Sequence, residues 1–154
     1  MFSIFKRKTK QVNPFEQGWL TDLIDIHCHL LPAVDDGSKS IEETLSLIDL
    51  LEEIGVKQHI LTPHIMEEYP SNDAIFLRAR FEELLAAITP DKASRLRLAA
   101  EYMLDAAFLD RLAEPLLTLG DRHILVETSY MAPPIGLMGL LADLRFKGLS
   151  PVLA

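Results

Sequence analysis

Cysteine is almost absent from this sequence, in which Cys28 is the only one among 154 residues. A single thiol forms no internal disulfide, so a packed core must hold the fold, and a reducing cytoplasm is the compatible compartment. Long apolar runs are also lacking, since no stretch approaches the roughly 20 residues of a membrane-spanning helix. We therefore expect a cytoplasmic protein with no stable membrane insertion.

Positive charge is scarce as well, with 15 Lys and Arg against 23 Asp and Glu and a net charge of −8. An acidic body argues against a nucleic-acid partner, which usually needs a basic face. Residues 1–21 are interpreted as a basic tip and lead-in, because bases gather between Lys6 and Lys10. The bases follow a short apolar stretch, whereas in a secretory signal they precede a longer one. No export is therefore expected. A solvated terminus is the favoured role, and contact with an anionic membrane or acidic partner is the alternative.

Three signatures of nucleophilic or nucleotide chemistry are missing. No arginine follows Cys28 at the distance of a cysteine-phosphatase loop, and no G-x-S-x-G elbow places a serine nucleophile. No glycine-rich phosphate loop with a lysine is found either. Chemistry that depends on those groups is therefore not predicted.

What the sequence does contain is a regular alternation of strand and helix patterns. Hydrophobic residues make up 49% and charged residues 25%, which predicts one globular domain. The predicted strands are 23–26, 56–61, 96–100, 124–126 and 151–154, and the predicted helices are 40–55, 73–88, 105–113 and 136–147. Strands that alternate with helices indicate an α/β fold of parallel βα units. A strand at 151–154 without a following helix predicts that 22–154 is the N-terminal portion of a larger domain. A small open sheet is the alternative.

Metal-binding side chains occur where these strands end. His27 and His29 follow the first strand, His64 the second and Glu101 the third, and Glu127 ends the fourth. In parallel βα folds the carboxyl ends of the strands share one edge, so these residues are expected to meet. Each of these residues, considered alone, could have a purely structural role. However, Glu101 and Glu127 close apolar strands, where burial of a carboxylate without a partner is costly, and a shared cation would supply that partner.

Alternation along an extended chain assigns the neighbouring residues. His27 and His29 share one side and Cys28 faces the other, where it is interpreted as a core residue. Asp25 is expected on the histidine side, accepting a ring N–H. His59 and His123 are interpreted as structural.

Imidazole and carboxylate ligands without thiolate suit manganese, iron or catalytic zinc. Several such groups together predict two or more ions, an arrangement that clamps a phosphoryl group and lowers the pKa of a bound water. Hydrolysis of a phosphate ester is one reaction that such a centre supports.

The motifs around these residues resemble a known superfamily. DIHCHLLP at 25–32 with DDGSKS at 35–40 is similar to the opening motif of the polymerase and histidinol phosphatase (PHP) superfamily. More narrowly, it resembles the bacterial tyrosine-protein phosphatases of capsular and exopolysaccharide systems. TPHIM at 62–66, AEYMLD at 100–105 and LVE at 125–127 suggest the same branch.

The resemblance implies a distorted TIM-like (PHP) barrel, incomplete in this chain, with two or three metal ions, commonly manganese. By motif position, the ligands are His27, His29, His64, Glu101 and Glu127, and Asp36 is a nearby acid that binds metal or handles protons. The implied substrate is phosphotyrosine on the cytoplasmic tail of a bacterial tyrosine kinase that controls polysaccharide export. A homo-oligomer is compatible with the family, although no interface can be named.

Such proteins continue with a His-Pro-Glu-Arg-like stretch and later an Asp-x-His pair, which this sequence lacks, so we expect this chain alone to be weakly active or inactive. The alternatives are a small-molecule phosphatase of the histidinol-phosphatase type and a non-catalytic module that binds a kinase or polysaccharide-assembly partner.

Overall fold

The structure is a computed structural model that describes residues 18, 20, 21 and 23–154. The predicted basic tip between Lys6 and Lys10 lies outside the described residues. The strands are β1 (Ile24–Cys28), β2 (Gln58–Leu61), β3 (His64–Ile65), β4 (Leu96–Leu98), β5 (Glu101–Met103), β6 (His123–Glu127) and β7 (Ser150–Leu153). The helices are α1 (Ile41–Glu53), α2 (Ala74–Ala87), α3 (Pro90–Ser94), α4 (Phe108–Arg111) and α5 (Leu137–Phe146).

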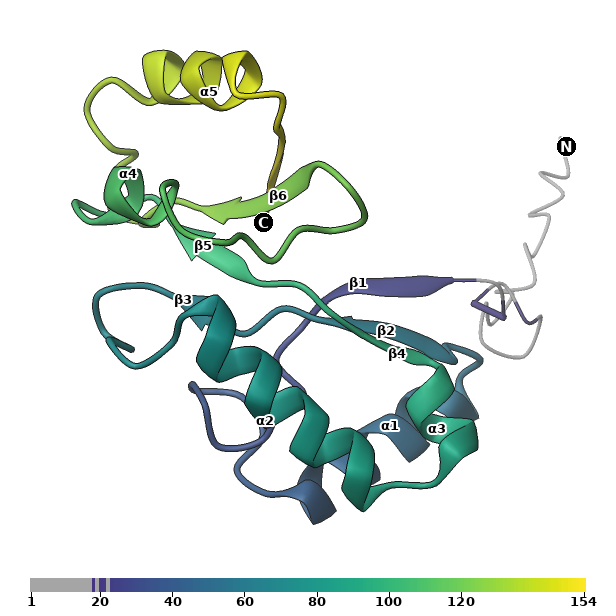
Figure 1. The fold of residues 1–154 in the computed structure, drawn as a ribbon. Coiled ribbons are helices and arrows are strands. Elements are labelled where there is room, and N and C mark those ends of the chain that lie inside the picture. The colour runs from purple at the N-terminus through teal and green to yellow at the C-terminus, as the bar shows by residue number, and fades with distance from the viewer. Residues whose placement is uncertain (1–17, 19, 22) are drawn as a thin grey trace, which may run out of the picture.

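All strand pairs are parallel, as predicted, in two sheets of order β1-β2-β4 and β3-β5-β6-β7. The two sheets continue one another, because the Ala99 N–H donates to the Leu61 carbonyl and the Glu101 N–H donates to the Pro63 carbonyl. The strands therefore lie side by side in chain order (Figure 1). A doubly wound sheet reverses its order at a switch point, whereas unreversed order is that of a βα barrel. The described strands form an arc and not a closed ring.

The breaks between β2 and β3 and between β4 and β5 change the predicted placement of two residues. His64 and Glu101 were expected to follow strands 56–61 and 96–100, but they begin β3 and β5. Pro63 has no N–H to donate, so a regular ladder cannot pass through it. The short helix α3 was not predicted.

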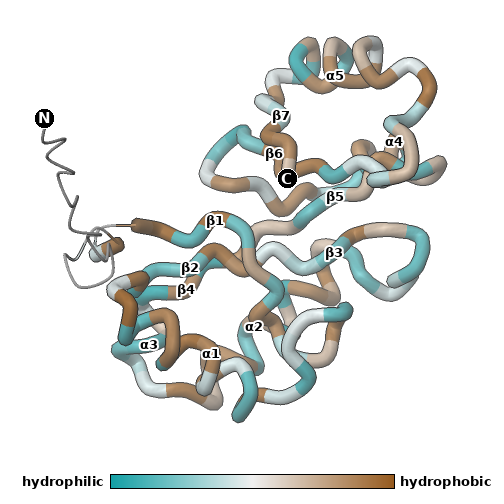
Figure 2. The backbone as a smooth tube through the Cα atoms, turned by 180° about the vertical axis from the view of Figure 1, so that it is seen from behind, coloured by the Kyte–Doolittle hydropathy of each residue, from teal (hydrophilic) through white to brown (hydrophobic). Residues whose placement is uncertain are grey.

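The two faces of the sheet have different coverings. Along β6, Ile124 and Val126 belong to the large core that includes residues of α1, α2 and α5, whereas Leu125 belongs to a small cluster on the other face. By alternation, Glu127 shares the face of Leu125. Figure 2 shows that hydrophobic and hydrophilic residues alternate along β1. Polar side chains on the less covered face are therefore free to form a site.

Local signals explain where the two long helices begin. Ser40 and Glu43 have the spacing of a capping box, which predicts a helix start at Ser40. Ser40 accepts the Glu43 N–H at the start of α1, as this motif predicts, although the Glu43 carboxylate accepts the Lys39 N–H instead of that of Ser40. Asp73 caps α2 by accepting the Phe76 N–H. The sequence predicts an apolar side for this helix that consists of Ile75, Phe76, Phe81, Leu84 and Leu85. The prediction is confirmed at Leu84, which is buried with Ala74 and Leu77, and it was wrong at Ile75, which is 74% exposed.

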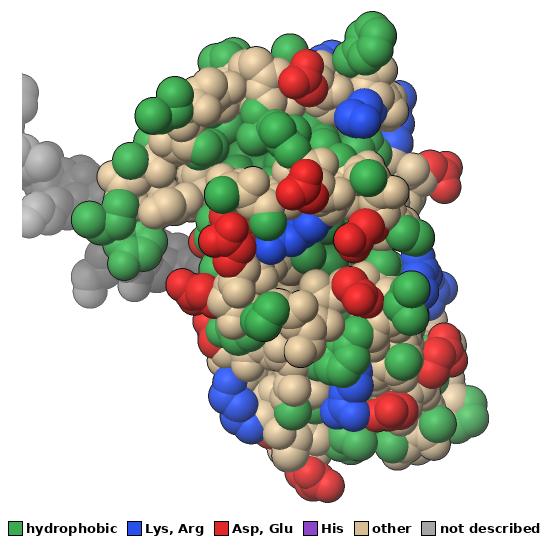
Figure 3. Space-filling model, turned by 60° about the vertical axis from the view of Figure 1, so that its left-hand side comes forward, with side chains coloured by type: hydrophobic (Ala, Val, Ile, Leu, Met, Phe, Trp, Pro, Cys, Tyr) green, Lys and Arg blue, Asp and Glu red, His purple; other side chains and the backbone are tan. Residues whose placement is uncertain are grey.

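The helices near the C-terminal end leave part of their apolar surface accessible. A cavity of about 540 Å³ lies between α4 and α5 and is lined mainly by apolar residues, among them Phe108, Leu109, Ile135 and Leu140. Figure 3 shows hydrophobic side chains gathered in a hollow on this face. Among the described residues, none of the helices combines the length and the apolar character needed to cross a membrane.

Thr62 joins the end of β1 to the break after β2. Its side chain is fully buried, accepts the Cys28 N–H at 3.1 Å and donates to the Cys28 carbonyl at 3.4 Å. We expect Thr62→Val to lower the free energy of unfolding by about 1–3 kcal/mol, because the buried Cys28 N–H loses its acceptor. Urea denaturation measures this loss, and Thr118→Val, at a half-buried hydroxyl away from the sheet break, is the control.

Candidate metal centre

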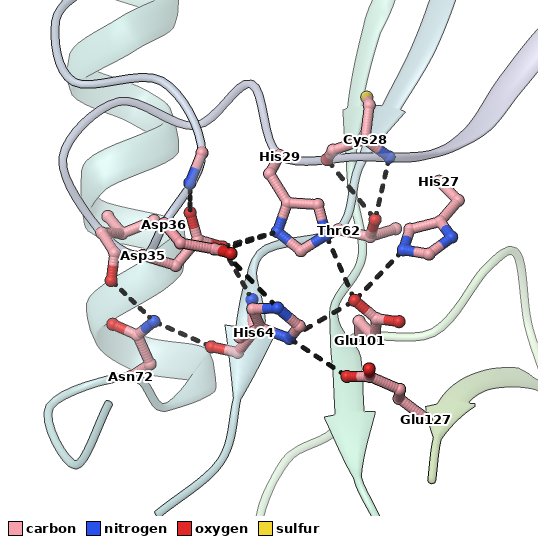
Figure 4. Close-up of polar contacts among 12 residues, drawn as sticks. His27, Cys28, His29, Asp35, Asp36, Thr62, His64, Asn72, Glu101 and Glu127 are labelled. Atoms are coloured by element: carbon pink, nitrogen blue, oxygen red, sulfur yellow. Dashed lines mark hydrogen bonds and ion pairs between the residues drawn. The ribbon is translucent and has the colours of Figure 1, made fainter. Parts of the chain in front are cut away.

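Three imidazole rings converge on one carboxylate oxygen at the less covered face of the sheet (Figure 4). The Oε2 atom of Glu101 lies 3.1 Å from His27 Nε2, 3.1 Å from His29 Nε2 and 3.3 Å from His64 Nδ1. Glu101 is only 2% exposed. His27 comes from β1, His29 from the segment after it, His64 from β3 and Glu101 from β5, so three neighbouring strands build the cluster.

The remaining predicted residues border the same cluster. Glu127 Oε2, at the end of β6, lies 3.8 Å from His64 Nδ1. Asp36 Oδ1 lies 3.6 Å from His64 Nε2 and 3.9 Å from His29 Nδ1, and its side chain is 69% exposed. The structure thus brings together all six residues that the sequence singled out.

Asp35 holds this cluster in place and was not singled out from the sequence. Its Oδ2 lies 2.8 Å from His29 Nδ1 and accepts the His64 N–H at 3.0 Å, while its Oδ1 accepts the Gly37 N–H at 3.0 Å. The carboxylate therefore orients the His29 ring so that Nε2 faces Glu101. Its only signal in the sequence is its position two residues before Gly37, which is typical of a turn closed by an aspartate side chain.

The expected role of Asp25 was wrong. The pairing of β1 with β2 shifts register between Asp25 and Cys28, so three steps along β1 match two steps along β2. This bulge turns Asp25 to the side of Cys28, away from the His27 and His29 rings. Asp25 instead lies 3.6 Å from the His59 ring and accepts the His27 backbone N–H. Alternation alone does not reveal a bulge.

The loop at 30–38 folds back onto His29, and this close approach requires Gly37. A Cβ atom at residue 37 would lie 2.1 Å from the His29 carbonyl oxygen and 2.4 Å from the His29 Cβ. The Asn72 side chain ties the loop to β3 by donating to the carbonyls of Val34 and His64. Glycine in the DDGSKS motif is thus explained by packing against the cluster.

Charge pairing within the cluster changes the acidity of its members. Burial by itself lowers the pKa of His29, but hydrogen bonds to the Asp35 and Glu101 carboxylates raise that pKa to about 10. The same contacts outweigh burial for both carboxylates and hold the pKa values of Asp35 and Glu101 below their usual range. In contrast, burial and the nearby Asp25 raise the pKa of the Cys28 thiol. A protonated, buried thiol is no nucleophile.

The donor atoms of the cluster are better arranged to bind a cation than to form hydrogen bonds with one another. Among the described residues, His64 Nδ1 and Glu127 Oε2 are buried without a hydrogen-bond partner. Three overlapping groups have ligand atoms within 4.8 Å of one another, namely His27-His29-Glu101, His29-Asp36-His64 and His64-Glu101-Glu127. Imidazole and carboxylate ligands suit manganese, iron and catalytic zinc, and overlapping groups have donors for more than one ion.

A pocket of about 610 Å³ opens beside the cluster. Its polar side contains Asp36, His64, Glu67, Glu68, Asp105, Glu127 and Ser129. Its apolar wall contains the apolar or aromatic residues Met66, Tyr69, Met103, Leu104, Tyr130, Met131, Ala132 and Pro134. Neither lysine nor arginine is among these lining residues, so the anionic end of a ligand is complementary to the polar side when cations occupy the metal-binding residues, and an apolar body is complementary to the apolar wall.

Known proteins are similar to this chain in sequence and in fold. The family model for capsular polysaccharide synthesis, CpsB/CapC, matches residues 23–154. The tyrosine-protein phosphatase YwqE of Bacillus subtilis (strain 168) is 29% identical over 140 residues, which cover 86% of this chain and 53% of YwqE. The tyrosine-protein phosphatase CpsB of Streptococcus pneumoniae is 34% identical over 143 residues, covering 86% of this chain and 56% of CpsB.

The similarity extends to three dimensions. Crystal structures of YwqE and CpsB, described as unique metal-dependent tyrosine phosphatases, include a chain that matches with a TM-score of 0.73 and 29% identity. The match covers 85% of this chain and 54% of the other. This chain therefore has the parallel α/β fold of those proteins, and it spans about half the length of the curated relatives.

Proposed function

This chain belongs to the CpsB/CapC family of capsular polysaccharide synthesis, and from that premise we propose that the protein is a metal-dependent phosphomonoesterase that acts on phosphotyrosine. The observation that carries the proposal is the convergence of three imidazoles on Glu101, beside a pocket with an apolar wall. The names of YwqE and CpsB support this reaction over a small-molecule phosphatase or a non-catalytic module.

We propose manganese, in two or three copies, as the metal, with His27, His29, His64, Glu101 and Glu127 as ligands. Bound among these residues, manganese supplies the Lewis acidity that phosphate ester hydrolysis needs. Iron and zinc share the ligand set and are the alternatives.

The chain's own residues orient the substrate and handle its proton. The apolar wall would exclude water from one side of the aromatic ring, and the metal-binding residues of the polar side would face the phosphate, an arrangement that the lining residues allow. Asp36 lines the pocket with a carboxylate that is 69% exposed and 3.6 Å from His64 Nε2. From there it can exchange a proton with both the solvent and the leaving phenolic oxygen, the role of a general acid or base.

The proposed substrate is a phosphotyrosine in the cytoplasmic tail of a tyrosine kinase that controls capsule or exopolysaccharide synthesis. An aromatic phosphate presented on a peptide matches a pocket with an apolar wall and a polar side. We accordingly propose a cytoplasmic location.

Removal of two imidazoles tests the proposal. We expect the double variant His27→Ala/His29→Ala to lose bound manganese, iron or zinc, measured by elemental analysis, because it removes two of the three groups that face Glu101. The cation-dependent hydrolysis of a phosphotyrosyl peptide, which we expect to be weak for this chain alone, should fall further by roughly 100-fold or more, since the metal provides several kcal/mol of transition-state stabilisation.

His123→Ala is the matched control, because His123 is an exposed histidine at the other end of β6. It should retain the metal content and the hydrolysis of the parent. Equal metal in the parent and in the double variant would rule out the proposed ligands, and hydrolysis that needs no cation would rule out the proposed reaction.

Tyr69 is expected to recognise the aromatic ring of the substrate. It lines the pocket and stacks on His64 with ring centroids 5.9 Å apart and planes 7° apart. We expect Tyr69→Ala to weaken binding of phenyl phosphate by about 2- to 10-fold, the worth of one aromatic pair, and to leave inorganic phosphate binding unchanged. Calorimetric titration of the metal-loaded protein measures both ligands. Tyr69→Phe, which keeps the ring, should behave as the parent, and equal losses for the two phosphates would contradict a contact with the ring.

A further inference from the structure

Asp25, Cys28 and His59 form a second cluster of metal-binding side chains, separate from the candidate metal centre. One ligand atom from each lies within 4.8 Å of the others. The cluster is on the opposite face of the sheet, because Cys28 pairs with Leu61 of the helix-covered core. Figure 4 shows the Cys28 sulfur directed away from the His27 and His29 rings.

The bulge in β1 creates this arrangement. Without it, Asp25 and Cys28 would face opposite sides of the strand, since they are three residues apart. The extra residue turns both to the face of His59, which is the register partner of Asp25 on β2. A bulge that aims side chains in this way is often a built feature of a site.

His59 is the observation that points to a ligand. It is 1% exposed, and among the described residues neither of its ring nitrogens has a hydrogen-bond partner. Its Nδ1 lies 3.6 Å from Asp25 Oδ2, which is beyond hydrogen-bond distance. A buried polar group without a partner is costly and rare in folded proteins.

The other two side chains leave one donor atom available each. Asp25 uses Oδ1 to accept the His27 N–H at 3.2 Å, so Oδ2 remains for the cluster. The Cys28 thiol makes a long contact of 3.5 Å with the Ile60 carbonyl. One nitrogen, one sulfur and one oxygen thus lie within 4.8 Å of one another.

We propose that Asp25, Cys28 and His59 bind a borderline-soft divalent cation of the zinc class. Thiolate, imidazole and carboxylate together are ligands of zinc, whereas manganese prefers oxygen. Binding joins the metal to Asp25 Oδ2, Cys28 Sγ and His59 Nδ1, and the thiol proton leaves to solvent. The Asp25 side chain is 25% exposed, so water can reach a fourth coordination position. The site links β1 to β2 behind the candidate centre and does not depend on the proposed phosphatase activity.

Cobalt titration of the chain tests the site, because Cys28 is the only cysteine and thiolate-to-cobalt charge transfer reports on it alone. We expect a near-ultraviolet charge-transfer band on addition of Co²⁺, and loss of the band on addition of Zn²⁺. The band should persist in His27→Ala/His29→Ala and disappear in Cys28→Ser. His59→Phe, which keeps an aromatic ring and removes both nitrogens, should weaken Co²⁺ binding at this band by at least 10-fold.

Several results would overturn the proposal. They are a parent without the band, an unchanged band in His59→Phe, and a band that vanishes in His27→Ala/His29→Ala, which would assign the thiolate to the candidate centre. X-ray absorption of the zinc-loaded parent needs no variant and so is independent of folding defects. A sulfur neighbour at about 2.3 Å is expected there, and only nitrogen and oxygen neighbours would refute the site.

Discussion

Replacement of Glu101 by glutamine is expected to remove most of the bound metal and to destabilise the metal-free chain. One oxygen of Glu101 faces all three imidazoles, so the substitution deletes the negative charge that they share. The loss of metal affinity should exceed the roughly 10- to 100-fold that follows loss of a residue that only orients a ligand. In the metal-free chain, removal of one partner from a buried ion pair should cost about 3 kcal/mol of unfolding free energy.

Elemental analysis and urea denaturation in the presence of a chelator measure these two effects separately. Glu82→Gln is the matched control, because Glu82 lies on an exposed face of α2. The control should keep its metal and change the free energy of unfolding by no more than about 0.5 kcal/mol. A Glu101→Gln protein with the metal content of the parent would show that Glu101 is not a ligand.

Asp35→Asn is expected to produce the second largest effect, although no sequence argument singled out Asp35. Its two oxygens accept the backbone N–H groups of His64 and Gly37. An asparagine side chain has only one oxygen. In either orientation of the amide, its NH2 group therefore faces one of these two backbone N–H groups, which is left without an acceptor. The unpaired, buried N–H should cost about 1–3 kcal/mol. The His29 ring also loses the carboxylate that orients it, and metal affinity should fall by about 10- to 100-fold.

The pH dependence of unfolding distinguishes this role from simple packing. Because the folded-state pKa of His29 is raised from 6.5 to about 10, its pairing contributes stability that is fully present below pH 6.5. That contribution is lost as the pH rises toward 10, so the metal-free parent should lose stability over this range. The decline should be smaller in Asp35→Asn, in which Glu101 and the more distant, exposed Asp36 are the carboxylates that still face His29. Asp36→Asn, at a 69% exposed carboxylate, should retain the decline of the parent. Identical slopes in all three proteins would contradict the pairing of His29 with Asp35.

The local chemistry of the chain was visible in the sequence. The capping residue Ser40 and the alternation of strand and helix patterns are short-range features. Ser40 predicted the start of α1, and the alternation predicted the parallel βα units. Parallel strands bring their carboxyl ends to one edge. That rule predicted correctly that His27, His64 and Glu101, far apart along the chain, meet in space, although His64 and Glu101 begin β3 and β5 and do not follow strand ends.

Only the tertiary structure showed which residues orient the candidate metal centre and which residues lie on the opposite face of the sheet. The bulge in β1 depends on pairing with β2, so alternation along the strand placed Asp25 on the wrong face. The role of Asp35 depends on how the loop at 30–38 folds onto His29 and β3. Burial of His59 beside Asp25 and Cys28 depends on the same pairing and on the helix-covered core. These features arise from contacts between residues distant in sequence, and they cannot be predicted from periodicity along the chain.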